Sequence, residues 1–277
     1  MTPRIATLIF TLIPALIPPL LVASLAGLPS VPAQAQDVSA IVKAADQYRM
    51  TADNLQVDTQ VQLFNADGSL NKERRYTVFA QAGRQSLVLM QSPAEKGQKV
   101  LMLGDDFWLL MPNSQRPLRI TPMQKLLGDA STGDIATLSW ADDYTATLVG
   151  EAPCAAPGAE KQEQLASVAL SGSKHCYHVG LQASRKGVTY QRIELWVGKQ
   201  RHEPVRANLY VQSDKLAKQA HFVLDKPGAG AVVSDMLLVD QLGNQKVTRV
   251  SYLSRKERTV PAEWLNPMFL ARNPSLE

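Results

Sequence analysis

Apolar and polar residues alternate along most of the chain beyond residue 50. Between residues 57 and 63 every second residue is Val, Thr or Leu, and Asp or Gln stands between them. A period of two predicts a strand with one buried face. The turn sequence Asn65–Gly68 and the similar stretch 75–81 then predict a hairpin. Further stretches of this kind, one of them at 164–170, bring the total to about eleven short antiparallel strands.

Helical spacing is confined to three places. Residues 37–50 carry apolar side chains on one stripe, and Asp37 or Ser39 can cap them, so we expect an N-terminal helix. Residues 122–138 mix apolar residues with glycines and predict a short helix, or a loop containing one, rather than a strand. A short closing helix is expected near 264–269. Strands and helices do not alternate regularly, so the pattern predicts a mainly β fold: a curved antiparallel sheet or incomplete barrel.

The first 35 residues have the three parts of a secretory signal peptide. Arg4 precedes an uncharged apolar run, and Ala33-Gln34-Ala35 forms a small-residue cleavage site. A retained membrane anchor is the alternative, but three prolines in the apolar run favour cleavage. No later apolar run approaches the roughly 20 residues needed to cross a bilayer. We therefore expect a signal peptide at 1–35, a single domain at 36–277, and a soluble protein in the periplasm.

Charge and cysteine content narrow the classes of function. The chain has 29 Lys and Arg against 25 Asp and Glu. Its densest basic clusters, 72–75 and 255–258, each contain an acid and no interleaved aromatic residue, which argues against nucleic acid as a partner. Cys154 and Cys176 are the two cysteines, and in an oxidising compartment two such residues usually pair. In the chain-entropy model, closing that loop stabilises the fold by about 3 kcal/mol.

Candidate catalytic groups are few. His175 and His178 flank Cys176, but on a strand they would point to opposite faces, and the cysteine already has a predicted partner. The acid pairs 105–106 and 142–143 stand at predicted turns, where Asp is favoured for geometry alone. No nucleophile elbow, phosphate loop or metalloprotease motif is present in the sequence. We therefore expect no enzyme activity, no metal and no cofactor.

Three neighbouring strands are apolar on both faces. Residues 87–90, 100–103 and 107–111 are almost continuously apolar, whereas a sheet with one wet face should alternate. A second layer must cover the other face, and the helix at 38–50 and the segment at 122–138 are candidates. They could enclose a lined cavity. A plain sheet-on-helix core is the alternative that apolarity alone favours.

The same part of the chain resembles a known family. Ser92 to Gly97 leads to the hairpin that ends in Phe107-Trp108-Leu109-Leu110-Met111-Pro112, and 116–120 and the small-residue segment 123–134 follow. Later, Glu194 to Val197 precedes Pro204 to Ala207. This order is similar to that of the outer-membrane lipoprotein-sorting proteins, a LolA-like group. The resemblance covers most of the chain beyond the signal peptide.

The resemblance implies a half-open antiparallel β-barrel covered by an N-terminal helix and a mid-chain helical lid. It also implies a non-catalytic carrier that binds the acyl chains of a lipid or lipoprotein in a hydrophobic cavity, between an inner-membrane transporter and an outer-membrane acceptor. Burial of acyl chains is favourable by about 0.8 kcal/mol per CH₂. From the apolar pattern, the expected lining consists of Leu89, Val100, Met102, Phe107, Trp108, Leu110 and Met123.

Two other functions remain open at this point. A protein-binding sensor domain of the periplasm can use the same half-barrel. An enzyme would require a convergent set of polar groups that the sequence does not reveal. A co-purifying lipid would favour the carrier, capture of a protein without lipid would favour the sensor, and turnover would favour the enzyme.

Overall fold

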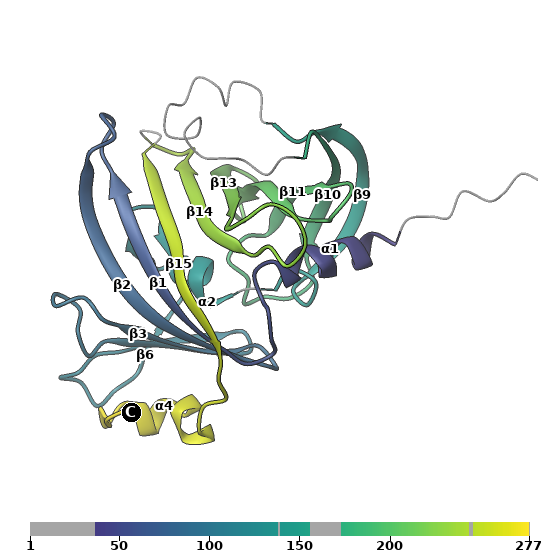
Figure 1. The fold of residues 1–277 in the computed structure, drawn as a ribbon. Helices are drawn as coiled ribbons and strands as arrows, with labels where there is room; N and C mark the ends of the chain where they lie inside the picture. Colours follow the sequence, from purple (N-terminus) through teal and green to yellow (C-terminus); the bar gives the residue numbers. More distant parts are fainter. Residues whose placement is uncertain (1–36, 138, 156–172, 244–245, 277) are drawn as a thin grey trace, which may run out of the picture. The chain divides into compact units, whose positions relative to one another are not determined.

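The computed structural model describes residues 37–137, 139–155, 173–243 and 246–276. The predicted signal peptide at 1–35 and the predicted strand at 164–170 lie outside these residues. The described part from Asp37 onward is one compact unit. Within it, thirteen strands form a single, strongly curved antiparallel sheet that does not close into a barrel (Figure 1). The predicted half-open, mainly β fold is confirmed.

The strands of the large sheet share a simple order along the chain. They are β1 (Leu55–Phe64), β2 (Leu70–Gln81), β3 (Gln85–Met90), β4 (Lys99–Leu103), β5 (Asp106–Leu110), β6 (Leu118–Ile120), β9 (Tyr144–Pro153), β10 (His175–Ala183), β11 (Arg192–Gly198), β12 (Pro204–Tyr210), β13 (Leu216–Leu224), β14 (Val233–Asp240) and β15 (Val247–Glu257). Strands β1 to β6 and β9 to β15 form two meanders, and β1 pairs with β15 to join them. The edges of the sheet are therefore β6 and β9.

The N-terminal helix forms as its pattern predicts. Helix α1 (Val38–Gln47) begins after Asp37, whose carboxylate accepts hydrogen bonds from the backbone N–H groups of Ser39 and Ala40. An N-cap of this kind satisfies donors that the first helical turn leaves without intrahelical partners. Ile41, Val42 and Ala45 on its buried stripe join the main core.

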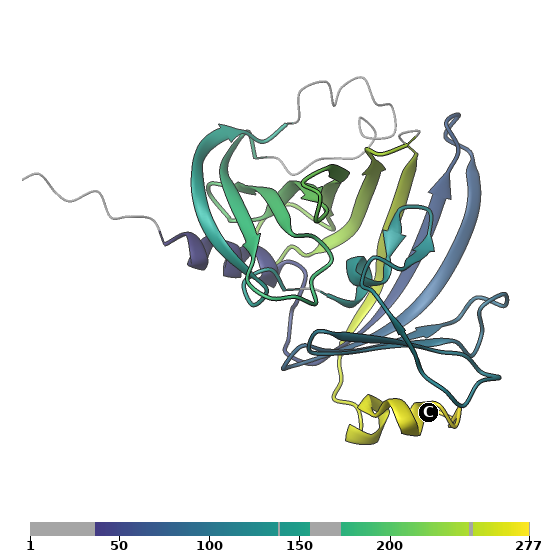
Figure 2. The same cartoon turned by 180° about the vertical axis from the view of Figure 1, so that it is seen from behind.

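The mid-chain segment differs from its prediction. It contains a two-stranded hairpin, β7 (Lys125–Leu127) with β8 (Ala130–Ser131), before the short helix α2 (Thr132–Ala136). Gly128 has φ +56° and makes the tight turn that connects the two strands. The expectation that this segment contains no strand is therefore wrong. Figure 2 shows this hairpin and α2 within the curve of the sheet.

The concave side of the sheet holds the main hydrophobic core. Inward-facing side chains from both meanders pack there with α1 and α2, and Val61, Leu195, Val233 and Val250 are completely or almost completely buried. The opposite side of β2 to β5 has a separate core. There Phe79, Leu87, Leu101 and Leu110 pack against the C-terminal elements η2 (Ala262–Leu265) and α4 (Pro267–Leu270).

This second core corrects one expectation about the doubly apolar strands. Their outer face is covered by Val260, Trp264, Leu270 and Ala271, not by the helix at 38–50 or the segment at 122–138. Lys99 at the start of β4 also donates a hydrogen bond of 2.6 Å to Asn273 of the C-terminal segment. Apolarity on both faces is therefore explained by two layers of protein, one on each side of the sheet.

The predicted disulfide is present. Cys154, directly after β9, is bonded to Cys176 of β10, and both are buried. The bond joins the end of β9 to the start of β10, at the edge of the sheet. Among the described helices, none is both long and apolar enough to cross a membrane.

Candidate functional site

The seven predicted lining residues do not share one face of the sheet. Val100, Met102 and Phe107 point to the concave core, and Met123 packs against it from the mid-chain segment. Leu89, Trp108 and Leu110 belong to the core on the opposite side, under the C-terminal segment. The reason is the pleat, since consecutive side chains of a strand point to opposite faces. The concave face is thus the candidate site, with four of the seven residues on it.

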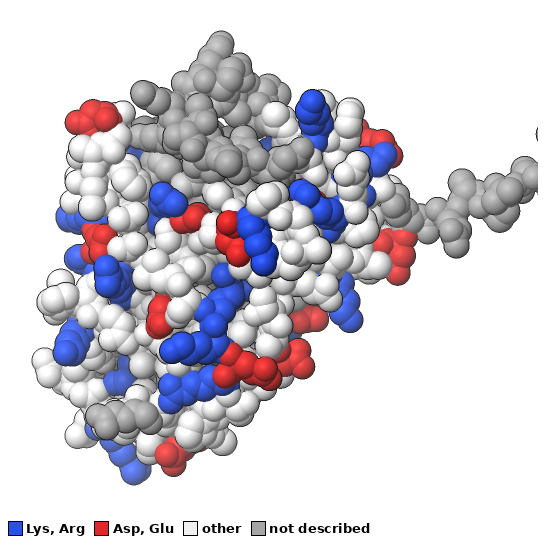
Figure 3. Space-filling view, viewed as in Figure 1, with Lys and Arg blue, Asp and Glu red and all other residues white. Residues whose placement is uncertain are grey.

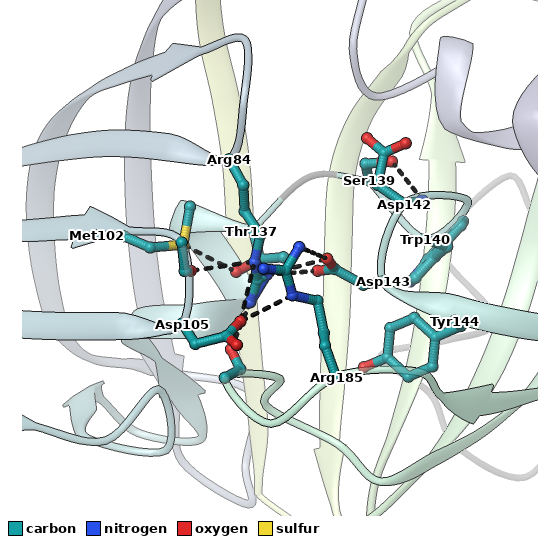
Figure 4. Close-up of polar contacts among 12 residues, drawn as sticks. Arg84, Met102, Asp105, Thr137, Ser139, Trp140, Asp142, Asp143, Tyr144 and Arg185 are labelled. Atoms are coloured by element: carbon teal, nitrogen blue, oxygen red, sulfur yellow. Dashed lines mark hydrogen bonds and ion pairs between the residues drawn. The ribbon is translucent and has the colours of Figure 1, made fainter.

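Side chains, not strand pairs, connect the two ends of the sheet. We call this group the clasp: Arg84 in the β2–β3 turn, Asp105 in the β4–β5 turn, Asp143 before β9, and Arg185 and Gly187 in the β10–β11 loop (Figure 4). Arg84 donates to both carboxylate oxygens of Asp143, at 3.0 and 2.8 Å, and to the carbonyl of Gly187. Arg185 donates to Asp105 at 2.7 Å. The hairpin turns of the first meander are thereby tied to the far end of the second.

The clasp is polar and differs in exposure along its length. The Arg84 and Asp143 side chains are 9% and 2% exposed, whereas those of Asp105 and Arg185 are 39% and 35% exposed. Burial raises the pKa of Asp143 to about 6, against the opposing attraction of Arg84 and Arg185. Arg84 also has φ +60°, a backbone conformation that non-glycine residues rarely adopt. The buried half of the clasp therefore carries a desolvation cost that its hydrogen bonds must offset.

Helix α1 holds the loop that leads into β9. The Asp46 carboxylate accepts hydrogen bonds from the backbone N–H groups of Trp140 and Ala141 and from the Ser139 hydroxyl, at 2.7 to 3.1 Å. Burial nevertheless raises the pKa of Asp46. The Asp46 carboxylate therefore holds the start of the loop, which links α1 to the clasp residue Asp143.

Helix α2 is fixed to the sheet by a buried ion pair. Asp134 lies 2.8 Å from Nζ of Lys218 on β13 and accepts hydrogen bonds from Ser131 and from the Tyr190 hydroxyl. Burial alone would raise the pKa of Asp134, but Lys218 and these donors hold it below the ordinary value. Gly133 is in close contact with Thr189, because a Cβ there would lie 1.8 Å from the Thr189 hydroxyl oxygen. The helix cannot shift without breaking these contacts.

A small cavity lies between these two polar groups, within the half-barrel. Its volume is about 40 Å³, room for roughly three water molecules. The polar part of its wall includes Arg49, Asp134 and Tyr190, and the apolar part consists of Ile193, Leu209, Ala220, Phe222 and Met236. A cavity of this size is too small for an acyl chain in this conformation.

The histidines and paired acids interpreted from the sequence have structural roles. On β10 His175 is exposed, and the ring of His178 stacks on Trp196 with centroids 4.3 Å apart. No group of three or more metal-ligating side chains gathers anywhere in the described part of the chain. Of the acid pairs, Asp105 and Asp143 prove to be clasp residues. Their local sequence indicated only turns, because their partners stand many residues away and become neighbours only in the folded sheet.

A family model and several solved structures match this protein. A family model described as "-like: Uncharacterized protein" matches residues 82–272, more than half of the chain, and the protein belongs to that family. The fold of this protein is similar to that of a LolA superfamily protein from Nitrosomonas europaea. The two are 26% identical with a TM-score of 0.70, over 83% of this chain and 97% of that chain. No curated protein matches the sequence.

Two more distant structures show the same fold. A putative outer membrane lipoprotein-sorting protein domain from Vibrio parahaemolyticus is 15% identical, with a TM-score of 0.61 over 84% of this chain and 98% of that chain. A DUF1329 family protein from Desulfovibrio piger is 20% identical, with a TM-score of 0.61 over 83% and 97%. The protein is a LolA-like protein, and the resemblance identified from its sequence is confirmed.

Proposed function

We propose that this protein is a non-catalytic periplasmic carrier that binds the acyl chains of a lipid or lipoprotein against the concave face of its half-barrel. It would serve outer-membrane lipoprotein sorting or transporter-linked lipid traffic. The observation that carries the proposal is the concave face itself, which is apolar along both meanders and is joined across its ends by a polar clasp. The similarity to a LolA superfamily protein supports it. The disulfide fits an exported protein.

Opening of the clasp would supply the space that an acyl chain needs. The apolar residues Val100, Met102 and Phe107 lie on the first meander and Phe222 and Met236 on the second, and both groups belong to one core. Separation of the meanders would expose this surface without breaking a strand pair, because the sheet is not closed. Bound acyl chains would then replace the side-chain contacts that are lost. A catalytic group is not needed for such exchange.

The first experiment is mass spectrometry of protein purified gently from the periplasm, followed by uptake of a fluorescent acyl probe from micelles. We expect retained lipid, or stoichiometric uptake of the probe. A protein that retains no lipid and takes up none from micelles contradicts the proposal. If it instead captures a protein partner without lipid, the function is that of a sensor domain.

A matched pair of variants tests which face of the sheet binds the acyl probe. Met123 and Leu89 are both partly buried, but Met123 packs against the concave core and Leu89 against the opposite one. Met123→Gln should weaken uptake of the probe, and Leu89→Gln should leave it unchanged. Circular dichroism checks that both variants fold. Equal effects on uptake would exclude the concave face as the binding surface.

A further inference from the structure

A buried arginine in the cavity wall lacks partners for most of its guanidinium group. Arg49, just after α1, is 6% exposed and lines the 40 Å³ cavity. Among the described residues its Nε and Nη1 have no hydrogen-bond partner, and Nη2 donates to the carbonyl of Thr137 at 3.3 Å. Its guanidinium lies over the ring of Trp140, 4.1 Å from the centroid. Donors of a buried cation that remain unpaired are costly, so they indicate a position for an acceptor.

The acids near Arg49 are already engaged by other groups. The closest oxygen of Asp46 is 4.0 Å from Nη1, and both Asp46 oxygens accept hydrogen bonds from the loop at 139–141. Asp134, also in the cavity wall, is paired with Lys218 at 2.8 Å and receives a hydrogen bond from Tyr190. Asp134 is therefore neutralised locally, whereas the nearest oxygen of Asp46 stays 4.0 Å from Arg49 and accepts no hydrogen bond from it. The cavity thus has one cationic donor group available to a ligand.

One side of the cavity wall is apolar and continues into the concave core. Ile193, Leu209, Phe222 and Met236 face the cavity from β11, β12, β13 and β14, and all four belong to the core that the carrier would use. A ligand placed there would have an anionic group at Arg49 and a hydrocarbon chain along these strands. A carboxylate, with three heavy atoms, is compact enough for the space of about 40 Å³ beside Arg49.

We propose that Arg49 binds the carboxylate of a long-chain fatty acid whose hydrocarbon chain lies against the concave face. This inference rests on the proposed carrier function and defines the cargo as an anionic single-chain amphiphile. Guanidinium–carboxylate pairs form charge-assisted hydrogen bonds, and the unpaired N–H groups of Nη1 can donate to a carboxylate oxygen. Arg49 is then the residue that distinguishes an acid from a neutral lipid with the same chain.

The test compares two probes that differ in one group. cis-Parinaric acid and its methyl ester have the same fluorescent chain, and only the acid is anionic at pH 7.5. We expect the wild-type protein to bind the acid at least ten-fold more tightly than the ester, the scale of one hydrogen bond to a charged group. Arg49→Gln should lose this preference and bind the ester as before, and Arg49→Lys should retain part of it. Arg249→Gln, in an ion pair on the outer face of β15, should keep the full preference.

The outcomes separate the inference from the function on which it rests. Equal affinity of the wild-type protein for acid and ester overturns the role of Arg49 and leaves the carrier function intact. A preference that survives in Arg49→Gln also overturns it. If neither probe binds, both the carrier function and the inference fail. In competition, oleate should displace the acid better than oleyl alcohol; stronger displacement by oleoyl lysophosphatidic acid would refute a carboxylate site. If Arg49→Gln does not fold, Arg49→Lys carries the test, and an undiminished preference for the acid in that variant overturns the role of Arg49.

Discussion

Replacement of Gly187 by Ala should open the clasp without removing a charged group. A Cβ at Gly187 would lie 2.3 Å from Cα and 2.6 Å from the carbonyl oxygen of Asp105, whereas ordinary contacts begin near 3.4 Å. The β4–β5 turn and the β10–β11 loop must therefore separate by about 1 Å. Overpacking of this kind typically costs about 1–3 kcal/mol. The population of the open form should then rise roughly 5- to 150-fold.

Limited digestion with trypsin measures this population directly. Arg84 is buried in the clasp, so cleavage after it requires opening, and its rate follows the population of the open form when closing is fast. We expect the Gly187→Ala protein to be cleaved after Arg84 roughly 5- to 150-fold faster than wild type. Uptake of an acyl probe should accelerate in parallel, if opening limits uptake.

The control is another glycine of the same region. At Gly180 on β10 an added Cβ would meet nothing closer than 3.4 Å, so Gly180→Ala should leave the cleavage rate unchanged. A folded Gly187→Ala protein that is cleaved after Arg84 at the wild-type rate would refute the reasoning. Such a result would mean that close packing of Gly187 against Asp105 does not hold the ends of the sheet together.

Three further predictions concern stability. Burial and the nearby Arg206 lower the pKa of His221 to about 4; as the pH falls from 6.5 to 4, the unfolded chain therefore binds a proton that the folded one does not. The free energy of unfolding should therefore fall over this pH range. Denaturant titrations should show this fall in wild type and a smaller one in His221→Gln; equal falls would contradict the prediction. Trp264→Ala should destabilise the fold by about 3–5 kcal/mol because it leaves a cavity in the outer core, and a loss below 1 kcal/mol in urea unfolding would argue against that packing. Replacement of Cys154 and Cys176 together by Ser should reduce stability by about 3 kcal/mol; an unchanged melting temperature would refute this.

Local patterns were sufficient to predict most elements of the fold. Asp37 and the apolar stripe behind it define α1, and the alternation in 57–63 defines β1, because both signals depend on residues close in sequence. The hairpin at 125–131 was missed because its strands are two or three residues long, too short for a period to emerge.

The candidate site was harder to predict than the fold. In a continuous apolar run, hydrophobicity does not indicate which face a residue occupies, so Leu110 was grouped with Phe107 although they lie on opposite sides of the sheet. The parity of positions within each strand would have separated them once a strand was assumed. The local sequence does not reveal the roles of Arg84, Arg185 and Arg49. Each role depends on partners that come near only in the folded protein.

The C-terminal segment also imposes an order on the synthesis of the protein. The apolar outer face of β3 to β5 is complete once Leu110 has been made, but Trp264 and Leu270, which cover it, are added roughly 150 residues later. At typical bacterial elongation rates of about 5–20 residues per second, that interval lasts roughly ten to thirty seconds. During this time the apolar outer face of β3 to β5 has no cover in the nascent chain. A chain that is truncated before Trp264 leaves this apolar face permanently exposed. The exposed face then distinguishes incomplete molecules from complete ones.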